Sequence, residues 1–293
     1  MNTKRQTKWF LIPYAAMALT MGSALVSFAA TGWAEENGEW VYYNNDGSKA
    51  TDVFKKSGNN WFYLDSEGIM AKNQLIEDDD NYFYVNSAGA MVTNQWRSIE
   101  NEDSGSDEPD EWWYYFQSNG KAVKKSGSSD NVKFVTLPTS TGQAKFTFDD
   151  EGHMLYGWID ESGEMLTDDD AWKSGMYYCS DNGDGRMATG WKYIPAVNDE
   201  DDDREGDGYW FYFSTNGKKT VDNDSKKING QYYGFDVNGK MLQGLYRIEF
   251  EANGKTIRSA EEIEDVDEIP DEDEDGVFVY YFGDSPKEGA MKT

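Results

Sequence analysis

Residues 61–70 read WFYLDSEGIM, and the same pattern returns as YFYVNSAGAM at residues 82–91 and as YYGFDVNGKM at residues 232–241. In each stretch an aromatic run is followed by a polar turn that ends in glycine, and methionine stands two residues later. Self-similarity at a short period is typical of repeat architectures, in which each unit packs only against its neighbours. The repeats fill most of the chain and leave little room for a catalytic domain.

The turn glycines mark about nine units between residues 31 and 293, of which the last is incomplete. Successive glycines lie 21 to 50 residues apart, so a unit of about twenty residues carries variable insertions. Acidic insertions are predicted at residues 100–111, 199–207 and 261–275. The turn glycines are Gly47, Gly68, Gly89, Gly120, Gly152, Gly185, Gly217, Gly239 and Gly289.

The residue types within a unit predict an all-β fold. Aromatic residues favour strands, and a short loop of Asn, Asp, Ser and Gly between two strands favours a hairpin. We therefore expect the glycine turn to join the two strands of each hairpin and the insertions to lie outside the hairpins. Because side chains alternate along a strand, Trp40 and Tyr42 should share one face while Val41 points to the other. An isolated hairpin is marginal in water, so each should pack against the next.

The N-terminus has the features of a secretory signal peptide over residues 1–30. Lys4, Arg5 and Lys8 precede an apolar run, and small residues follow it at Ala29 and Ala30. The run is long enough to leave a retained membrane anchor as the alternative. Cleavage is the preferred interpretation, with no membrane insertion of the remaining chain.

The charge of the chain limits its partners. The formal net charge is −28, and removal of the three signal-peptide cations would take it to about −31. So negative a chain is not expected to bind nucleic acid or anionic membranes through electrostatics. A basic partner, a cation or a neutral polymer remains open.

The chain offers few residues for catalysis or zinc binding. It has one histidine, His153, expected to be an exposed turn residue, and one cysteine, Cys179, expected to be buried in a strand. We therefore expect no catalytic residues, no metal and no cofactor. Calcium in the acidic loops, at residues 78–80 or 201–203, is left as an unsupported alternative. Residues 181–185, which read DNGDG, are interpreted as a hairpin turn and not as a calcium loop.

The order Gly-Trp, spacer, Gly-x-Trp-x-Tyr, turn, Gly-x-Met-x-Thr-Gly-Trp resembles the cell-wall-binding repeats of Gram-positive surface proteins. Residues 32–43 and 185–191 carry it most clearly. That family includes choline-binding repeats and related glucan-binding repeats. The resemblance implies hairpins stacked as a left-handed solenoid, with ligand pockets between consecutive hairpins.

The resemblance also implies a way to bind choline. A quaternary ammonium has no hydrogen to donate and is held by the faces of two or three aromatic rings. Carried over to this sequence, Trp33 and Trp40 with Tyr63 form the most complete pocket. The further candidate pairs are Trp96 with Trp113 and Trp191 with Trp210. The methionines expected to pack between hairpins are Met70, Met91, Met154, Met187, Met241 and Met291.

The preferred hypothesis is a secreted, non-catalytic protein of the cell wall or cell surface that binds choline-bearing teichoic acid or an extracellular glucan. Several weak sites on one array would reinforce one another. Two alternatives stay open at this point. The chain could be the targeting region of a longer wall hydrolase or other enzyme with a catalytic domain beyond Thr293, or it could be a structural adhesin shaft.

Overall fold

The computed structural model describes residues 31–102, 108–125, 131–195, 208–221, 226–254, 256–264, 269 and 277–287. The predicted signal peptide, Gly289 and Met291 lie outside these residues. So does the whole of the predicted insertion at residues 199–207. Within the described part of the chain no helix is long and apolar enough to cross a membrane.

The chain forms two compact units. The first comprises Met1–Lys55 and Tyr63–Met70, and the second comprises Lys56–Phe62 and Ala71–Thr293. The first unit contains β1 (Gly32–Glu36) and β2 (Glu39–Tyr43), and the boundary between the units passes through β3 (Val53–Ser57) and β4 (Asn60–Leu64).

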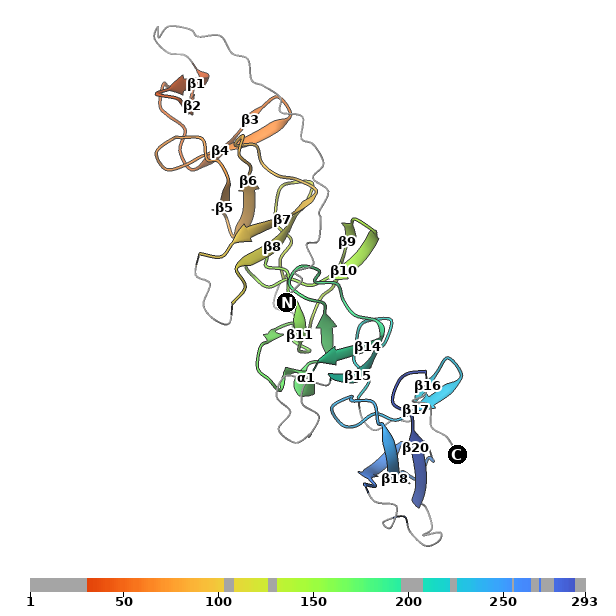
Figure 1. Ribbon diagram of the computed structural model, residues 1–293. Helices are drawn as coiled ribbons and strands as arrows, with labels where there is room; N and C mark the ends of the chain where they lie inside the picture. The colour runs from red at the N-terminus through yellow and green to blue at the C-terminus, as the bar shows by residue number, and fades with distance from the viewer. Residues whose placement is uncertain are drawn as a thin grey trace, which may run out of the picture. The chain divides into compact units, whose positions relative to one another are not determined.

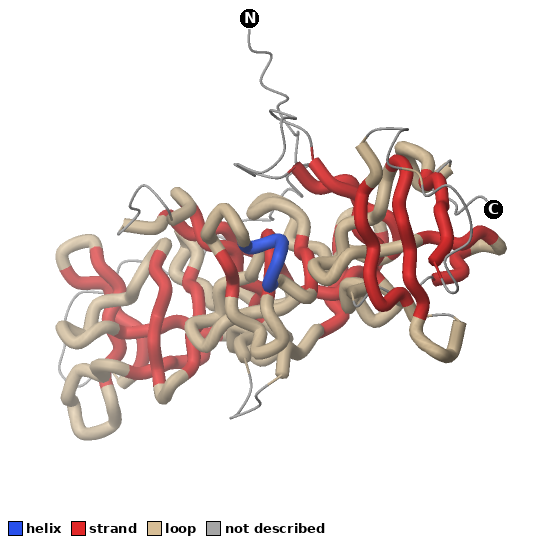
Figure 2. The backbone as a smooth tube through the Cα atoms, turned by 90° about the horizontal axis from the view of Figure 1, so that it is seen from below, coloured by secondary structure: helices blue, strands red, loops and turns tan. Residues whose placement is uncertain are grey.

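The second unit is also built from short strands, with one four-residue helix among the residues described (Figure 2). Its elements are β5 (Gln74–Asp78), β6 (Asn81–Val85), β7 (Gln95–Glu100), β8 (Glu111–Phe116), β9 (Val135–Thr139), β10 (Gly142–Phe146), β11 (Gly157–Ile159), β12 (Met165–Leu166), α1 (Ala171–Ser174), β13 (Tyr177–Cys179), β14 (Gly190–Pro195), β15 (Gly208–Phe213), β16 (Lys226–Ile228), β17 (Gln231–Tyr233), β18 (Gly244–Phe250), β19 (Ile257–Glu262) and β20 (Val277–Phe282).

Antiparallel pairing of strands that are near in sequence confirms the all-β hairpin prediction. The sheets have two or three strands each, and in most of them a strand pairs with the next one in the chain, as in β7–β8 and β14–β15 (Figure 1). Two sheets have three strands, in the orders β12-β11-β13 and β19-β18-β20. The array is therefore a series of separate small hairpins and not one continuous sheet.

The predicted position of the hairpin turn is wrong. The paired strands are the Gly-Trp strand and the aromatic strand, and the tight turn between β1 and β2 is Asn37-Gly38. Both residues have positive φ, 53° and 86°, as the twist of a two-residue hairpin requires. The repeated glycine turn follows the aromatic strand instead and closes only a single bridge, such as Phe235↔Met241. Its glycine nevertheless has positive φ in every described copy.

The predicted place of the acidic insertions is wrong for the same reason. Residues 101–110 connect β7 to β8, and residues 196–207 connect β14 to β15, so these insertions lie within hairpins. The third insertion connects β19 to β20, which both pair with β18. A hairpin tip lies at the surface and tolerates added chain, whereas the segment between hairpins is held by packing.

Consecutive hairpins are joined by a repeated backbone hydrogen bond. The amide of the residue two positions after the turn glycine donates to the carbonyl oxygen of the residue that opens the preceding aromatic strand. In the first unit Met70 donates to Trp40 over 2.8 Å. In the second unit the equivalent bonds run from Met91 to Trp61, Ala122 to Tyr82, Met154 to Trp113, Met187 to Lys145, Lys219 to Met176 and Met241 to Trp210.

Packing between neighbouring repeats gives the methionines and turn glycines a shared role. The methionine side chain of one repeat lies where a β-carbon on the turn glycine of the next repeat would be, as Met154 does at Gly185 and Met187 at Gly217. Met241 is also buried, with 1% exposure. The prediction that methionines pack between hairpins is confirmed for these residues.

The alternation of the aromatic strands puts one set of side chains into the core. Val41 is buried, while its neighbours Trp40 and Tyr42 point to the other face, as predicted. Phe211 and Phe213 of β15 are fully buried in the same way. Cys179 is buried and bridges Met187 as Leu64 bridges Met70, which confirms its predicted place in a strand.

Candidate ligand-binding site

The first tryptophan of each predicted pair lies opposite a tyrosine of the partner strand. The register pairs Trp33 with Tyr42, and their ring centroids are 5.4 Å apart in an edge-to-face arrangement. Trp96 and Tyr115 repeat this contact at 5.2 Å, and Trp191 and Tyr212 repeat it at 5.1 Å. Cross-strand aromatic pairs of this kind stabilise a sheet and fix the orientation of both rings.

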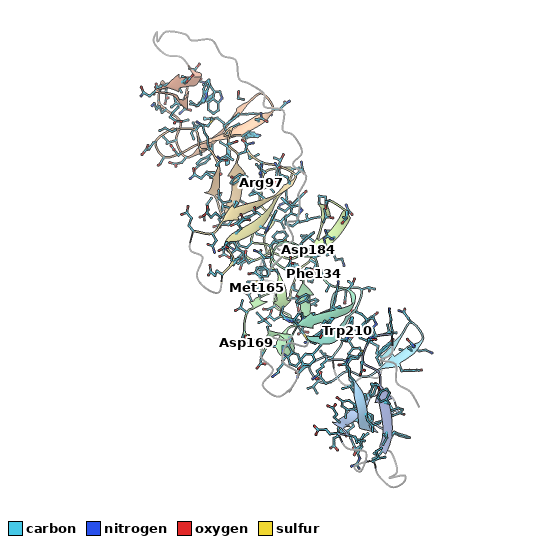
Figure 3. The ribbon with its side chains drawn as sticks, in the orientation of Figure 1. Arg97, Phe134, Met165, Asp169, Asp184 and Trp210 are labelled. Atoms are coloured by element: carbon cyan, nitrogen blue, oxygen red, sulfur yellow. The ribbon has the colours of Figure 1, made fainter. Side chains whose placement is uncertain are left out.

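The second tryptophan of each predicted pair shares a face with the first. Trp40 pairs with Glu35, Trp113 with Ser98 and Trp210 with Tyr193. Each second tryptophan lies two residues before the tyrosine that faces the first tryptophan. Because side chains alternate along a strand, it points to the same face as that tyrosine. The two tryptophans of each predicted pair, 33/40, 96/113 and 191/210, therefore lie on one face of their hairpin. Trp210 of β15 is labelled in Figure 3.

The following hairpin supplies further rings, which the sequence did not place. Trp96 lies 4.7 Å from Phe146 and stacks on Phe148 at 5.9 Å with an interplanar angle of 20°. Trp191 has the same surroundings, with Tyr233 at 4.7 Å and Phe235 stacked at 5.7 Å and 22°. The two junctions are thus built alike. All six tryptophans of the predicted pairs are half-buried, so part of each ring remains open to solvent.

Tyr63 occupies a different position from these added rings. It lies 5.0 Å from Phe54 of its own hairpin, in an edge-to-face contact. This is the cross-strand arrangement that Tyr42 and Tyr115 make with their tryptophans. Tyr63 is half-buried, and its assignment to the pocket of Trp33 and Trp40 stays a prediction.

Two half-buried tyrosine rings already have lysines over them. Lys55 Nζ lies 4.9 Å from the centroid of Tyr42, and Lys226 Nζ lies 5.3 Å from that of Tyr212. Both lysines come from the hairpin that follows the ring. The same faces therefore attract cations within the chain, as expected for electron-rich rings.

The sequence-based prediction of the site did not include a third Gly-Trp pair, Gly157-Trp158. Trp158 faces Tyr178 at 5.1 Å and Phe211 at 5.1 Å, but it is buried, unlike the tryptophans above. Trp172 of α1, which lies 6.2 Å from Phe211, is buried in the same cluster. The Gly-Trp dipeptide is a signal in the sequence that could have identified this position.

The prediction that His153 is an exposed turn residue is wrong. Its side chain is 20% exposed, stacks on Trp112 at 4.3 Å and forms a 2.7 Å contact between Nδ1 and Asp149 Oδ2. His153 also lies near two carboxylates. The atoms of Asp149, Glu151 and His153 that could bind a metal ion lie within 4.8 Å of one another.

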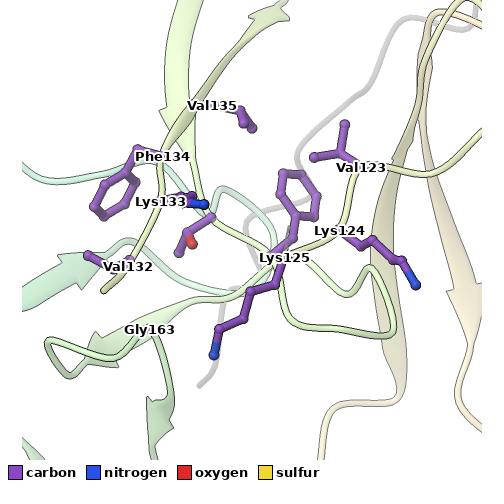
Figure 4. Close-up of a pocket in the computed structure, with 10 residues that line it drawn as sticks. Val123, Lys124, Lys125, Val132, Lys133, Phe134, Val135 and Gly163 are labelled. Carbon is purple, nitrogen blue, oxygen red and sulfur yellow. The ribbon is translucent and has the colours of Figure 1, made fainter. Parts of the chain in front are cut away.

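A pocket in the second unit is not lined by any of the seven predicted residues, but Phe148, which lines it, stacks on Trp96. Its volume is about 300 Å³, and Lys124, Lys125, Lys133 and Phe134 are among the residues that line it (Figure 4). Lys125 is paired with Glu164 at 2.7 Å, and Lys124 Nζ donates to Asp80 O over 2.5 Å. The lysines are therefore engaged by the chain itself.

Comparison with protein families fits this hairpin geometry. The model of the choline-binding repeat matches residues 30–67 and 54–96, and that of the cell wall binding repeat matches residues 113–122. Residues 30–96 thus carry choline-binding repeats. The matched residues include Trp33, Trp40, Tyr63, Trp96 and Trp113. Comparison with curated proteins gave no match.

Several solved structures are similar to this chain. The modular autolysin LytC from Streptococcus pneumoniae is 20% identical, with a TM-score of 0.48, over 90% of this chain and 47% of that one. The choline-binding domain of CbpL from the same organism is 21% identical, with a TM-score of 0.45, over 73% and 88%. Choline binding protein F is 22% identical, with a TM-score of 0.44, over 73% and 58%. The chain thus spans about half the length of LytC.

Proposed function

We propose that this chain is a secreted, non-catalytic module that attaches to choline-bearing wall polymers through half-buried tryptophan pairs. The observation that supports it most is the shared arrangement at Trp96/Trp113 and Trp191/Trp210. In each, two half-buried tryptophans lie on one hairpin face, and rings of the next hairpin pack against the first of them. Electron-rich ring faces of this kind attract a quaternary ammonium.

The absence of a catalytic role is supported by the reactive residues that the structure describes. Burial raises the pKa of the Cys179 thiol to about 12, so it is not a thiolate nucleophile at neutral pH. His153 is held by Asp149 and Trp112 in a turn. A targeting role within a longer enzyme would use the same binding surface.

Retention on a choline-substituted resin tests the proposal. Purified protein lacking residues 1–30 should bind the resin, and free choline should elute it. A dextran resin is the comparison, because tryptophan faces also stack on sugars. Flow-through on choline together with retention on dextran would contradict choline binding and favour a glucan.

Variants then locate the sites. Trp96→Ala with Trp113→Ala, and Trp191→Ala with Trp210→Ala, should each weaken retention, since each removes one ring pair. Trp61→Ala is the matched control, because Trp61 is 41% exposed and belongs to no predicted pair. Circular dichroism must show an intact fold in all variants. Equal retention of both double variants and the wild type would refute these assignments.

A further inference from the structure

Besides α1 and the burial of Trp158, one residue position distinguishes this junction from the junctions on either side. Two residues after the turn glycine, where Met154, Met187 and Met241 stand in other repeats, this repeat has Lys219. Its backbone bond to the preceding hairpin is kept, from its amide to Met176 O over 2.7 Å. The lysine therefore projects into the space that methionine fills elsewhere.

Lys219 is buried between aromatic rings. It is 3% exposed, and no other charged residue in the described part of the chain falls in the buried class. Its Nζ lies 5.0 Å from the centroid of Trp158 and 5.6 Å from that of Phe211. A cation within about 6 Å of a ring face is held by the electrostatics of the ring.

The ammonium also has hydrogen-bond acceptors on its remaining side. Its Nζ donates to Trp172 O over 2.6 Å and lies 3.3 Å from Lys173 O. These carbonyls belong to the end of α1, where helical partners are lacking. The ammonium has three hydrogens, so it can satisfy such carbonyls while its charge stays near the rings. A quaternary ammonium cannot, because it has no hydrogen to donate.

The charges around the junction are balanced by nearby groups. Asp236, in the turn after β17, raises the pKa of Lys219 in part, but burial has the larger effect and lowers it to about 8. The side chain of Lys173 forms an ion pair with Asp170, at 2.9 Å.

The stem of Lys219 packs against Gly239, where an added β-carbon would lie 3.1 Å from the Cγ and Cδ atoms of the lysine.

We propose that the junction of Trp158, Phe211 and α1 is an ammonium-binding site occupied by the chain's own Lys219, and that it selects a primary ammonium over a quaternary one. The site is then closed to choline in the wild-type chain. Removal of the lysine side chain should open it to a small primary amine. This inference stands on the contacts of Lys219 and does not depend on choline binding by the other junctions.

Chemical rescue tests the proposal. Lys219→Ala removes three carbons and the ammonium, which n-propylammonium replaces atom for atom. At pH 7 and constant chloride, n-propylammonium should raise the midpoint of thermal unfolding of the variant by about 2–5 °C once its concentration exceeds Kd. Choline and tetramethylammonium at the same concentrations should raise it by less.

Lys227→Ala is the matched control. Lys227 Nζ lies 5.3 Å from the Tyr232 ring, but both residues are exposed, so no enclosed site is created. The control should show no selective response to n-propylammonium. The proposal is overturned if Lys219→Ala shows none either, or if choline stabilises it as much as the primary amine.

A second measurement uses the wild-type protein, so it tests the enclosure of Lys219 even if Lys219→Ala does not fold. Brief reductive methylation of the folded wild-type protein, followed by peptide mass spectrometry, should modify Lys227 and leave Lys219 unmodified. Unfolding in guanidinium should then make the two lysines equally reactive. Equal modification in the folded protein would overturn the enclosure of Lys219. Failed choline-resin binding alone would leave this result unaffected, so the two proposals fail separately.

Discussion

The backbone amide of Met241 donates a 2.8 Å hydrogen bond to the carbonyl oxygen of Trp210. This bond ties the methionine position of one repeat to the tryptophan position of the repeat before it. The same link recurs along the second unit and, between Met70 and Trp40, in the first. Because backbone groups make it, it survives changes of side chain at both positions. The ring positions can therefore vary in chemistry while the spacing of neighbouring hairpins is kept.

Turn glycines should be sensitive where the preceding repeat packs against them. In Gly239→Ala the new β-carbon would lie 2.6 Å from Thr220 O, a backbone atom that cannot move aside cheaply. Gly230→Ala is the matched control, because its φ of 91° resembles the 85° of Gly239 but open space surrounds it. We expect the control to lose about 1–2 kcal/mol from the positive φ alone and Gly239→Ala to lose about 1–3 kcal/mol more. Urea denaturation measures both, and equal losses would contradict the packing argument.

Stability should depend on alkaline pH through Lys219. Its pKa is lowered from 10.5 to about 8, so between these values the unfolded chain binds more protons than the folded one. The free energy of unfolding should therefore rise with pH across this window, by on the order of 3 kcal/mol from this group. Other groups titrate there too, so the measurement is the difference between wild type and Lys219→Met. A difference that stays constant from pH 7.5 to 10.5 would rule out the burial of a charged lysine.

Cys179 should be unreactive in the folded protein. The side chain is fully buried, and burial raises its pKa to about 12, so the reactive thiolate is scarce at pH 8. Ellman's reagent should release little colour from native protein and one equivalent after addition of guanidinium. Rapid reaction of the native protein would show that the strand that ends at Cys179 is open.

The connection between β7 and β8 should be replaceable by a tight turn. The last register pair, Glu100↔Glu111, corresponds to Glu36↔Glu39 of the first hairpin, which Asn37-Gly38 closes. Replacing residues 101–110 with Asn-Gly should keep the fold and change the midpoint of thermal unfolding by less than about 4 °C.

The control for this replacement is Ala-Ala, which disfavours the positive φ that both turn residues need. It should unfold at a lower temperature than the Asn-Gly variant. If the two variants unfold together, or if Asn-Gly abolishes the fold, the insertion is not a simple hairpin tip.

Much of the local architecture could be predicted from the sequence because its cause is local. Glycine at turn positions, aromatic strand formers and alternation placed Val41 in the core and Trp40 on the opposite face. The position of the hairpin turn could not be predicted in this way. Two turn signals compete in each repeat, and only strand pairing decides that Asn37-Gly38 closes the hairpin while Gly47 closes a single bridge.

The sequence by itself determined the repeat, the all-β class and the tryptophan pairs, because residue type and spacing encode strands, turns and the family pattern. Only the tertiary structure decided which rings meet across hairpins, as Trp96 meets Phe148, since that contact depends on how one hairpin stacks on the next. It also decided that Lys219 is buried in a ring-lined site while Lys227 is exposed. A lysine has the same chemistry at both positions, and only its enclosure turns it from a surface charge into the occupant of a site.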